Sequence, residues 1–341
     1  MKAALLTRFG TPEALTYTDV DTPAPRTGEV LVRVRAAGVN RIDHYLREGM
    51  MADIPLPHVL GSDAAGEVAA LGAGVDGFAV GDPVIPVPGY PMAAGEAAVE
   101  PFTLSPSYAL LGAGAWGTYA EYVRVPARYL VEDATGLPPE QVATLPMVAV
   151  TGVRAVKEVG GVRAGQKVVV LGGSSGTGGF HVQLARALGA EVLSTTTSDA
   201  KADYIRALGA GEVVNTREPG AFEAAVAEWT DGAGADVVID NLGGDFLQRS
   251  VNVARPGGTV VAMGFVDAPT VGLDIRTLFF PQKRILGSLM GTTDDLTFAL
   301  ALAAAGKIVP QVDRVLPLSE AAHAHELLMA GGVRGNLVLV P

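Results

Sequence analysis

Short apolar stretches alternate with helix-compatible segments from about Lys167 onwards. Lys167–Leu171 (KVVVL) is an apolar run of the kind that a buried parallel strand shows. The segments after it are largely alanine-rich, and further β-like runs recur between them at Glu191–Thr195, Glu212–Asn215, Asp236–Asp240, Thr259–Met263 and Arg284–Met290. This alternation predicts a doubly wound α/β domain built on a parallel sheet.

The first third of the chain follows a different pattern, with short strands and many turns. Val30–Val34 (VLVRV) places a basic residue among apolar ones, as expected of a half-exposed strand. Five glycines lie between Val59 and Val80, where they suit tight bends between short strands. We therefore expect this part of the chain to be rich in β-structure.

A glycine-rich turn joins the first apolar run to a helix-like segment. Residues 172–179 read GGSSGTGG. Val182, Ala185 and Leu188 then share one helix face, and Gly189 is placed to end the helix. A backbone that approaches a pyrophosphate from a helix N-terminus needs small residues of this kind. The turn therefore predicts a dinucleotide site, and the expected contacts are Ser174, Ser175, Gly176, Thr177 and Gly178.

The residues after the second run bear on the choice between NAD and NADP. In NAD-binding domains an acidic residue about 20 positions beyond the glycines binds the ribose hydroxyls. Asp199 is the only acid here, and its alternative role is a helix cap. Lys201 and Arg217 are placed to meet a 2′-phosphate, although both equally suit a solvated surface. The hydroxyl cluster with Lys201 favours NADPH, and the expected contacts are Thr196, Thr197, Ser198 and Lys201.

The composition excludes several classes of site and partner. The 341 residues carry a formal net charge of −11, which argues against binding to nucleic acid or to an anionic membrane. The chain has no cysteine, so disulfides, thiolate nucleophiles and zinc–thiolate sites are excluded. Its first residues do not form a signal peptide, and Leu296–Ala305 is too short to span a membrane. We expect a cytoplasmic protein.

Five segments of the chain resemble the medium-chain dehydrogenase/reductase superfamily, specifically its zinc-independent quinone oxidoreductase (zeta-crystallin-like) branch. They are the glycine loop, the ending GNLVLVP, Gly38–Gly49 (GVNRIDHYLREG), Pro57–Val84 (PHVLGSDAAGEV with GDPV behind it) and Gly117–Ala127 (GTYAEYVRVPA). The resemblance covers nearly the whole chain. It implies a GroES-like β-barrel catalytic domain of residues 1–124 and 293–341, with a Rossmann domain of residues 125–292 between the two parts. A cleft between these domains is expected to hold nicotinamide and substrate.

Zinc-dependent relatives carry metal ligands that this chain does not match. By the resemblance, Asn40, Ser62 and, less directly, Met147 stand at the positions of the catalytic ligands, and none suits a zinc alcohol dehydrogenase site. The lobe that binds structural zinc in such relatives lacks its cysteines, and its ligand positions hold Pro91, Ala94, Ala97 and Ser105. No metal is expected, and the conformation of this lobe, residues 89–112, is left open.

The same resemblance assigns candidate catalytic residues. Asn40 and Tyr45, in an Asn-x-x-Asp-x-Tyr arrangement, match positions that approach nicotinamide and substrate in quinone oxidoreductases. We expect them to bind and polarise the carbonyl, because hydride transfer without a metal needs hydrogen-bond donors near the developing negative charge. A turn role for Asn40 and simple packing for Tyr45 are the alternatives. Asp43 is expected to organise the loop.

The nicotinamide is expected to lie beside two strand ends. Ligands of doubly wound sheets bind at the carboxyl ends of the strands, and two turns there match the family's contacts. The contacts implied in these turns and elsewhere are Asn241, Gly264, Phe265, Thr151 and Asn336.

The predicted function is therefore reduction of a quinone or an enone by NADPH. Reduction of a 2-enoyl thioester or alkenal is one alternative, although Met50 and Met51 stand where enoyl reductases often carry a proton-donating tyrosine. NADPH binding without catalysis is another. The strand predicted at Arg284–Met290 would leave a sticky sheet edge, which the family commonly pairs with a second subunit, so we expect a homodimer.

Overall fold

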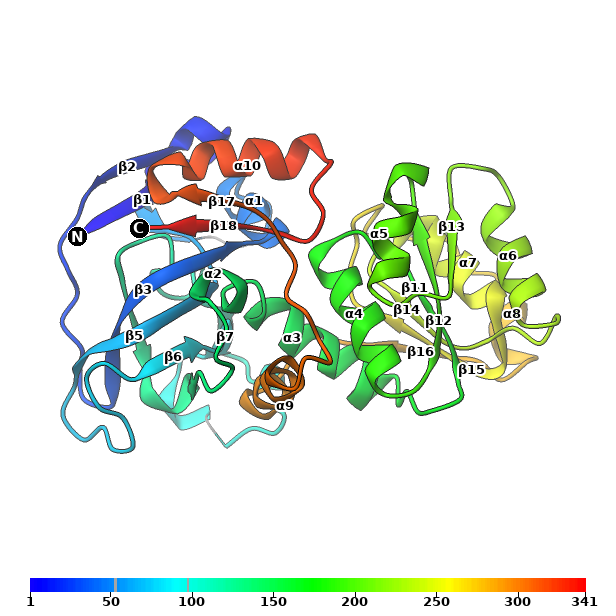
Figure 1. Ribbon diagram of the computed structural model, residues 1–341, viewed down its shortest axis with the longest axis horizontal. Helices are drawn as coiled ribbons and strands as arrows, with labels where there is room; N and C mark the ends of the chain where they lie inside the picture. The colour runs from blue at the N-terminus through cyan, green and yellow to red at the C-terminus, as the bar shows by residue number, and fades with distance from the viewer. Residues whose placement is uncertain (52–53, 97) are drawn as a thin grey trace. The chain divides into compact units, whose positions relative to one another are not determined.

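The computed structural model describes residues 1–51, 54–96 and 98–341, which separate into two units (Figure 1). The first unit comprises Met1–Val150, Gly291–Ala305 and Pro310–Pro341. The second comprises Thr151–Met290 and Gly306–Val309. The first unit thus reaches beyond the expected boundary at residue 124, because the two strands at Tyr122–Glu132 belong to its largest sheet.

In the second unit, the apolar runs form one six-stranded parallel sheet with the order β13-β12-β11-β14-β15-β16. The side chains of Val168, Val169 and Val170 are all fully buried, because helices cover both faces of the central strand. This sheet confirms the predicted doubly wound domain. Its strands are β11 (Lys167–Val170), β12 (Glu191–Thr196), β13 (Glu212–Asn215), β14 (Ala235–Asp240), β15 (Ala254–Ala262) and β16 (Arg284–Gly287).

Helices cover the two faces of this sheet. They are α4 (Gly176–Ala187), α5 (Ala202–Ala207), α6 (Ala221–Trp229), α7 (Gly244–Val253) and α8 (Arg276–Phe279). One face carries α4 and α5, and the other carries α6 and α7 with α8 beside them (Figure 1). The apolar core under α6 and α7 joins Phe222 and Val251 to strand residues such as Val238. A π-helix, η5 (Val153–Val159), and a short 3₁₀ turn, η6 (Asp199–Lys201), complete the unit.

The first unit is built around one long strand, β3 (Glu29–Val39). Its first half pairs with β9, its second half pairs with β18, and β5 runs along its other edge. The largest sheet has the order β10-β6-β5-β3-β18-β17, and a smaller one has the order β2-β1-β4. The remaining strands are β1 (Lys2–Leu6), β2 (Leu15–Asp19), β4 (His58–Val59), β5 (Asp63–Leu71), β6 (Pro83–Pro86), β7 (Gly89–Pro91), β8 (Tyr108–Leu110), β9 (Tyr122–Pro126), β10 (Leu130–Glu132), β17 (Val312–Pro317) and β18 (Asn336–Val340).

Short helices connect and cover these strands. The α-helices are α1 (Arg41–Arg47), α2 (Pro139–Val142), α3 (Pro146–Gly152), α9 (Thr293–Ala304) and α10 (Ala321–Ala330). The 3₁₀ turns are η1 (Pro12–Ala14), η2 (Ala94–Glu96), η3 (Phe102–Leu104), η4 (Ala127–Tyr129) and η7 (Leu318–Glu320). Helix α10 packs against β2, β17 and β18 (Figure 1). All of the apolar segment noted at Leu296–Ala305 except its last residue lies in α9.

The cysteine-free lobe is ordered around aromatic rings. The rings of Tyr90 and Tyr129 stack with centroids 4.6 Å apart, and Phe102 meets Tyr129 edge-on at 5.5 Å. Glu96 accepts hydrogen bonds from the backbone N–H of Ser107 and from the hydroxyl of Ser105. These contacts join β7, η2, η3 and β8 without a metal ligand among their side chains. Of the four former ligand positions, Ala97 lies outside the described residues.

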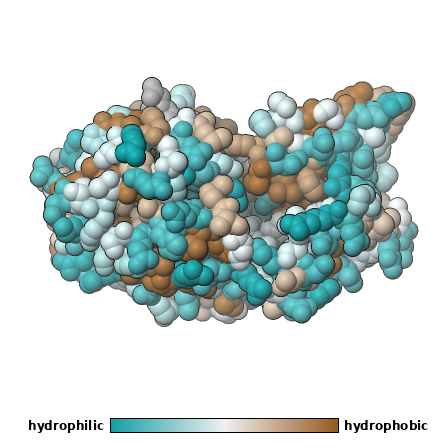
Figure 2. Space-filling view, turned by 90° about the horizontal axis from the view of Figure 1, so that it is seen from above, coloured by the Kyte–Doolittle hydropathy of each residue, from teal (hydrophilic) through white to brown (hydrophobic). Residues whose placement is uncertain are grey.

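Hydrophobic side chains also reach the surface, singly and in patches. The face drawn in Figure 2 mixes hydrophilic and hydrophobic residues, as most protein surfaces do. Within the described residues, no helix combines the length and the apolar character that crossing a membrane requires.

Candidate functional site

Asn40 lies between the end of β3 and the start of α1, and it is held there from both sides. Its backbone N–H donates to Asp43 Oδ2 at 2.8 Å, which closes the first turn of the helix. Its side-chain Nδ2 donates to Asp63 Oδ2, also at 2.8 Å. Only 8% of Asn40 is exposed. The amide orientation is therefore set by Asp63, which leaves the second N–H of Nδ2 without a partner among the described residues.

Asp63, the first residue of β5, is the centre of this arrangement. Its Oδ2 accepts from Asn40, and its Oδ1 accepts from the backbone N–H of Met147 at 2.8 Å. The residue is completely buried. Burial raises the pKa of Asp63 well above its ordinary value, while the hydrogen bond from Asn40 acts in the opposite direction.

Asp43 is a second buried carboxyl group in the same region. Its Oδ2 accepts from the Tyr119 hydroxyl at 2.8 Å as well as from the backbone of Asn40. Burial raises the pKa of Asp43 to about 6, against the effect of these donors. Asp43 thus organises the start of α1, as expected from the sequence.

The residues at the former zinc-ligand positions do not fit a zinc ion. Asn40 and Met147 are both tied to Asp63, and the Ser62 hydroxyl donates to Leu111 O at 2.7 Å. Zinc sites in proteins use thiolate, imidazole and carboxylate ligands, whereas these positions offer an amide, a thioether and a hydroxyl. Among the described residues, no cluster of three His, Asp or Glu side chains could hold a metal ion.

Tyr45 lies on α1, one turn beyond Asn40, and is half-buried. Its ring centroid lies 5.6 Å from that of His44. On the same helix, Arg47 is almost fully buried and donates to His44 Nδ1 at 2.8 Å, to His325 Nδ1 at 3.3 Å and to Gly10 O. These contacts anchor α1 against α10, a role of Arg47 that the sequence analysis missed.

Asn336 lies near the same end of β3 as Asn40. In the antiparallel pair of β18 and β3, Leu337 stands opposite Val39. Asn336 and Asn40 are the next residues in this register. The first unit therefore brings together three of the predicted site residues, Asn40, Tyr45 and Asn336.

The glycine loop of the second unit has the geometry of a phosphate cradle. Ser175 is the N-cap of α4: its Oγ accepts from Gly178 N at 3.0 Å and donates to Gly172 O at 2.9 Å. A Cβ atom on Gly178 would lie 2.2 Å from Gly172 O, and one on Gly173 would lie 2.2 Å from Ser194 Oγ. Larger residues do not fit here. Ser174, Gly176 and Thr177 are half-buried in this turn at the helix N-terminus.

The end of β12 carries the hydroxyl cluster. Thr195 holds the glycine loop, because its Oγ1 accepts from Gly172 N at 2.9 Å. Thr196 is buried and exchanges hydrogen bonds with the Ser198 backbone, while Thr197 is exposed. Asp199 accepts a hydrogen bond from Asn215. The half-buried Lys201 ends η6, two residues beyond Asp199.

The turn after β14 lies beside the glycine loop. Asp240 fixes it by accepting from the backbone N–H groups of Leu242 and Gly243, each at 2.9 Å. The Oδ1 atom of Asn241 is buried without a hydrogen-bond partner among the described residues, and a Cβ on Gly172 would lie 3.6 Å from it. An orphaned acceptor at the edge of a glycine cradle fits a bound dinucleotide.

Three further predicted contacts lie in the second unit. Gly264 follows β15 and packs so closely on Asn241 that an added Cβ would lie 2.3 Å from its carbonyl oxygen. Phe265 is 41% exposed. Thr151 Oγ1 lies 3.6 Å from the sulfur of Met290. The glycine loop and the Asn241 turn thus meet where β11 and β14 are neighbours, the switch point of the strand order.

Comparisons with known proteins agree with this architecture. Residues 26–139 match the model of the alcohol dehydrogenase GroES-like domain, and residues 176–305 match that of the zinc-binding dehydrogenase. Quinone oxidoreductase of Pseudomonas aeruginosa is 32% identical over 98% of this chain and 97% of its own. Alcohol dehydrogenase of Geobacillus stearothermophilus is also 32% identical, over 99% and 98%.

Solved structures show the same fold over the full chain. A NAD-dependent alcohol dehydrogenase superposes with a TM-score of 0.93 and 36% identity, covering 100% of both chains. A crotonyl-CoA carboxylase/reductase superposes with a TM-score of 0.91 and 27% identity, covering 100% of this chain and 88% of its own. The first unit is therefore a GroES-like domain and the second a Rossmann domain. With these relatives and this fold, the chain belongs to the medium-chain dehydrogenase/reductase superfamily of oxidoreductases.

Proposed function

We propose that this protein is a zinc-independent reductase that uses NADPH to reduce quinones or related conjugated carbonyl compounds. The observation that carries the proposal is the hydrogen bond from Asn40 to Asp63, which fixes an amide donor at a position where zinc-dependent relatives carry a metal ligand. An amide N–H held in this way can stabilise a developing oxyanion. Quinone oxidoreductases are among the relatives, and they match nearly the whole chain.

In this proposal, residues of the second unit bind the cofactor and residues of the first unit bind the substrate. When bound, NADPH supplies the hydride. The backbone N–H groups at the start of α4 bind the pyrophosphate, and Asn241 binds the nicotinamide end. Asn40 donates its remaining amide N–H to the substrate carbonyl, and Tyr45 orients the substrate ring. Solvent protonates the product, because a reduced quinone takes its protons readily from water.

NADPH, rather than NADH, is proposed from the groups after β12. Thr197 is exposed and Lys201 lies four residues further on, so hydroxyl and ammonium groups follow β12 at the place where a 2′-phosphate would bind. Asp199, the one acid at this point, is engaged by Asn215. We further propose a cytoplasmic homodimer, paired through the β16 edge.

A second candidate is the reduction of a 2-enoyl thioester or an alkenal. It is favoured by the likeness to a crotonyl-CoA carboxylase/reductase. Met50 and Met51 are 63% and 47% exposed after α1, where such an enzyme would need a proton donor for carbon. We therefore rank this candidate below quinone reduction.

The substrate that oxidises NADPH separates these functions. Purified protein is given NADPH with 1,4-benzoquinone, with crotonaldehyde or with a crotonyl thioester, and loss of the reduced nicotinamide absorbance is followed. Faster turnover with the quinone supports the proposal. Faster turnover with the thioester or the aldehyde supports the second candidate. NADPH binding without turnover on any of them would show a binding protein instead.

A further inference from the structure

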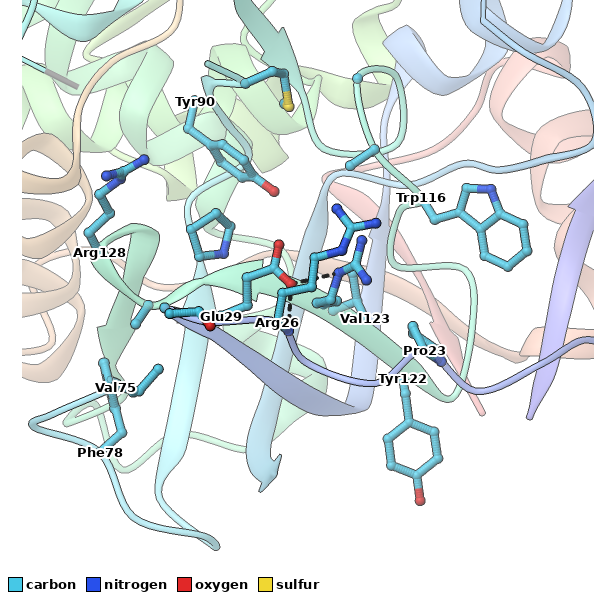
Figure 3. Close-up of a pocket in the computed structure, with 18 of the residues that line it drawn as sticks. Pro23, Arg26, Glu29, Val75, Phe78, Tyr90, Trp116, Tyr122, Val123 and Arg128 are labelled. Atoms are coloured by element: carbon cyan, nitrogen blue, oxygen red, sulfur yellow. Dashed lines mark hydrogen bonds and ion pairs between the residues drawn. The ribbon is translucent and has the colours of Figure 1, made fainter. Parts of the chain in front are cut away.

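A cavity of about 1200 Å³ lies in the first unit, around the start of β3 (Figure 3). Its walls come from β3, β7 and β9 and from the loops at residues 74–78 and 114–117. Glu29, the first residue of β3, lines the cavity, whereas Asn40 follows the last residue of that strand. At about 3.3 Å per residue, these positions are roughly 30 Å apart. The cavity is therefore separate from the carbonyl-binding residues, and the proposed reaction does not use it.

Charged side chains of both signs line this cavity. Arg26, Arg124 and Arg128 all line it, in a chain whose net charge is −11. Arg124 is neutralised by Glu29, whose Oε2 lies 2.9 Å from its Nε. Within the described part of the chain, Arg26 and Arg128 form no ion pair. The acids Asp21 and Asp76 also line the cavity, and both are exposed to solvent.

Tyr90 presents a hydrogen-bond donor to the same space. The residue is only 3% exposed, and its ring is fixed by stacking on Tyr129. Its hydroxyl makes no hydrogen bond to any residue that the structure describes. Figure 3 shows this hydroxyl directed towards the side chains of Glu29 and Arg26. Burial raises the pKa of Tyr90, so the hydroxyl keeps its proton and remains a donor.

Ring surfaces line the remaining walls. Trp116 is 38% exposed, and Tyr122 and Phe78 are half-buried. Figure 3 shows Arg26 between the rings of Tyr90 and Trp116. Exposed aromatic faces favour a planar, apolar ligand body, and guanidinium groups favour a carboxylate, which they bind in a bidentate manner.

We propose that this cavity is a binding site for a small aromatic carboxylate. The carboxylate is bound by Arg26 with the Tyr90 hydroxyl, and the ring packs on Trp116 and its aromatic neighbours. Such a ligand binds independently of the nicotinamide cofactor and the carbonyl substrate.

Tryptophan fluorescence provides the test, because the chain has only two tryptophans. Trp229 lies in the second unit, so a Trp229→Phe background leaves Trp116 as the sole reporter. Benzoate is titrated as the probe, with benzamide as the uncharged analogue and acetate as the anion without a ring. We expect saturable quenching by benzoate. Both analogues should bind at least about tenfold more weakly, because benzamide lacks the negative charge and acetate lacks the ring.

Substitutions of the residues that line the cavity show whether benzoate binds there. Arg26→Ala and Tyr90→Phe are each expected to weaken benzoate binding by about tenfold or less, and together by more. Arg35→Ala is the matched control, since it removes an exposed arginine of β3 that does not line the cavity. Thermal unfolding of each variant verifies that the unit remains folded.

Competition distinguishes this site from the cofactor site. Benzoate binding that is unchanged by saturating NADPH supports the proposal, whatever the fate of the proposed reductase activity. Quenching that does not saturate, equal binding in the Arg26→Ala and Arg35→Ala variants, or displacement by NADPH would each overturn it.

Discussion

At the scale of single residues, the site of the first unit depends on two buried carboxyl groups. Asp63 holds the side chain of Asn40, and Asp43 holds its backbone. Both acids are completely buried, which is costly unless donors satisfy them. Donors satisfy both oxygens of Asp63 and the Oδ2 atom of Asp43, whereas Asp43 Oδ1 has no partner among the described residues. The result is one amide fixed in one orientation. We infer that the acids are retained to position Asn40 rather than to stabilise the fold.

Replacing Asp63 with asparagine tests this positioning role. Asp63→Asn keeps the shape but turns one acceptor into a donor, which opposes either Asn40 Nδ2 or Met147 N. We expect kcat for quinone reduction to fall by about tenfold or more, with little change in the affinity for NADPH. Steady-state kinetics and NADPH fluorescence measure the two effects separately.

The matched control is Asp19→Asn, which changes an acid of the same unit whose side chain is 76% exposed. It should leave kcat unchanged. A wild-type kcat in the Asp63→Asn variant would show that Asp63 does not position the donor.

The raised pKa of Asp43 predicts how the free energy of unfolding depends on pH. Its pKa is about 6 in the folded protein and near 3.8 when unfolded, so the folded state binds the proton more tightly. Its contribution to stability is thus present at low pH and is lost as the pH rises towards and through 6. Relative to Asp43→Asn, the wild-type free energy of unfolding should fall by about 1 kcal/mol between pH 5 and pH 7.5.

Urea denaturation of both proteins across this pH range measures the difference. If the wild type instead became more stable relative to Asp43→Asn as the pH rises, this result would contradict the raised pKa of Asp43.

Sequence reasoning at this scale proposed Asn40 but did not identify Asp63 and Tyr119, which hydrogen-bond to Asn40 and Asp43. Asn40 lies in a recognisable arrangement with Tyr45, whereas its partner Asp63 is 23 residues away and Tyr119 is 76 residues from Asp43. The pairing of β3 with β5 brings Asp63 to Asn40. Contacts between residues so far apart in the chain cannot be read from local spacing. An acid directly after Ser62, at a position expected to be buried, was the available signal.

At the scale of elements, the described residues of the cysteine-free lobe pack around aromatic rings. The contacts of Phe102, Tyr90 and Tyr129 form a small apolar centre, and Glu96 ties η2 to the turn before β8. Its conformation was left open from the sequence, because three aromatic rings spread over 40 residues have no period. Only the fold brings them together.

Substitution of Phe102 tests how much this aromatic packing contributes to the stability of the protein. Phe102 is 7% exposed, so Phe102→Ala removes buried aromatic area and leaves a cavity, and the protein should lose about 3 kcal/mol of stability. Leu104→Ala, at a residue of the same 3₁₀ turn that is 70% exposed, should cost less than about 0.5 kcal/mol. Urea denaturation compares the two. Equal effects, or a fall in Tm of the wild type after chelator treatment, would contradict this explanation.

The strands of the second unit were predictable because each contains a short run of consecutive apolar residues. Glu212–Asn215 forms β13 with these same limits. The long β3 was recognised only in part, at Val30–Val34, because its second half is built from small residues and is recognised as a strand only by its pairing with β18.

At the scale of the whole molecule, β16 is the edge of the parallel sheet, since it pairs with β15 alone in the described sheet. Phe279 and Phe280, which precede it, are 53% and 70% exposed, with ring centroids 4.2 Å apart. Exposed aromatic rings beside an open edge are typical of an interface. The sequence indicated this edge, and the proposed homodimer follows from it.

Sedimentation at micromolar concentration tests the dimer. The wild type should sediment as a dimer, and Phe280→Asp should shift it towards the monomer, because a charge would be buried in the interface. Val80→Asp, at a residue of the first unit that is 67% exposed, should leave the dimer intact. A monomeric wild type would refute the proposed pairing.

The most direct test of the account is the rate at which 1,4-benzoquinone oxidises reduced nicotinamide in chelator-treated protein, compared between NADPH and NADH. We expect turnover that survives the chelator and is faster with NADPH, because in the proposed mechanism the Asn40 amide takes the place of a metal and the groups after β12 bind a 2′-phosphate. Turnover that disappears with the chelator and returns with zinc would contradict it.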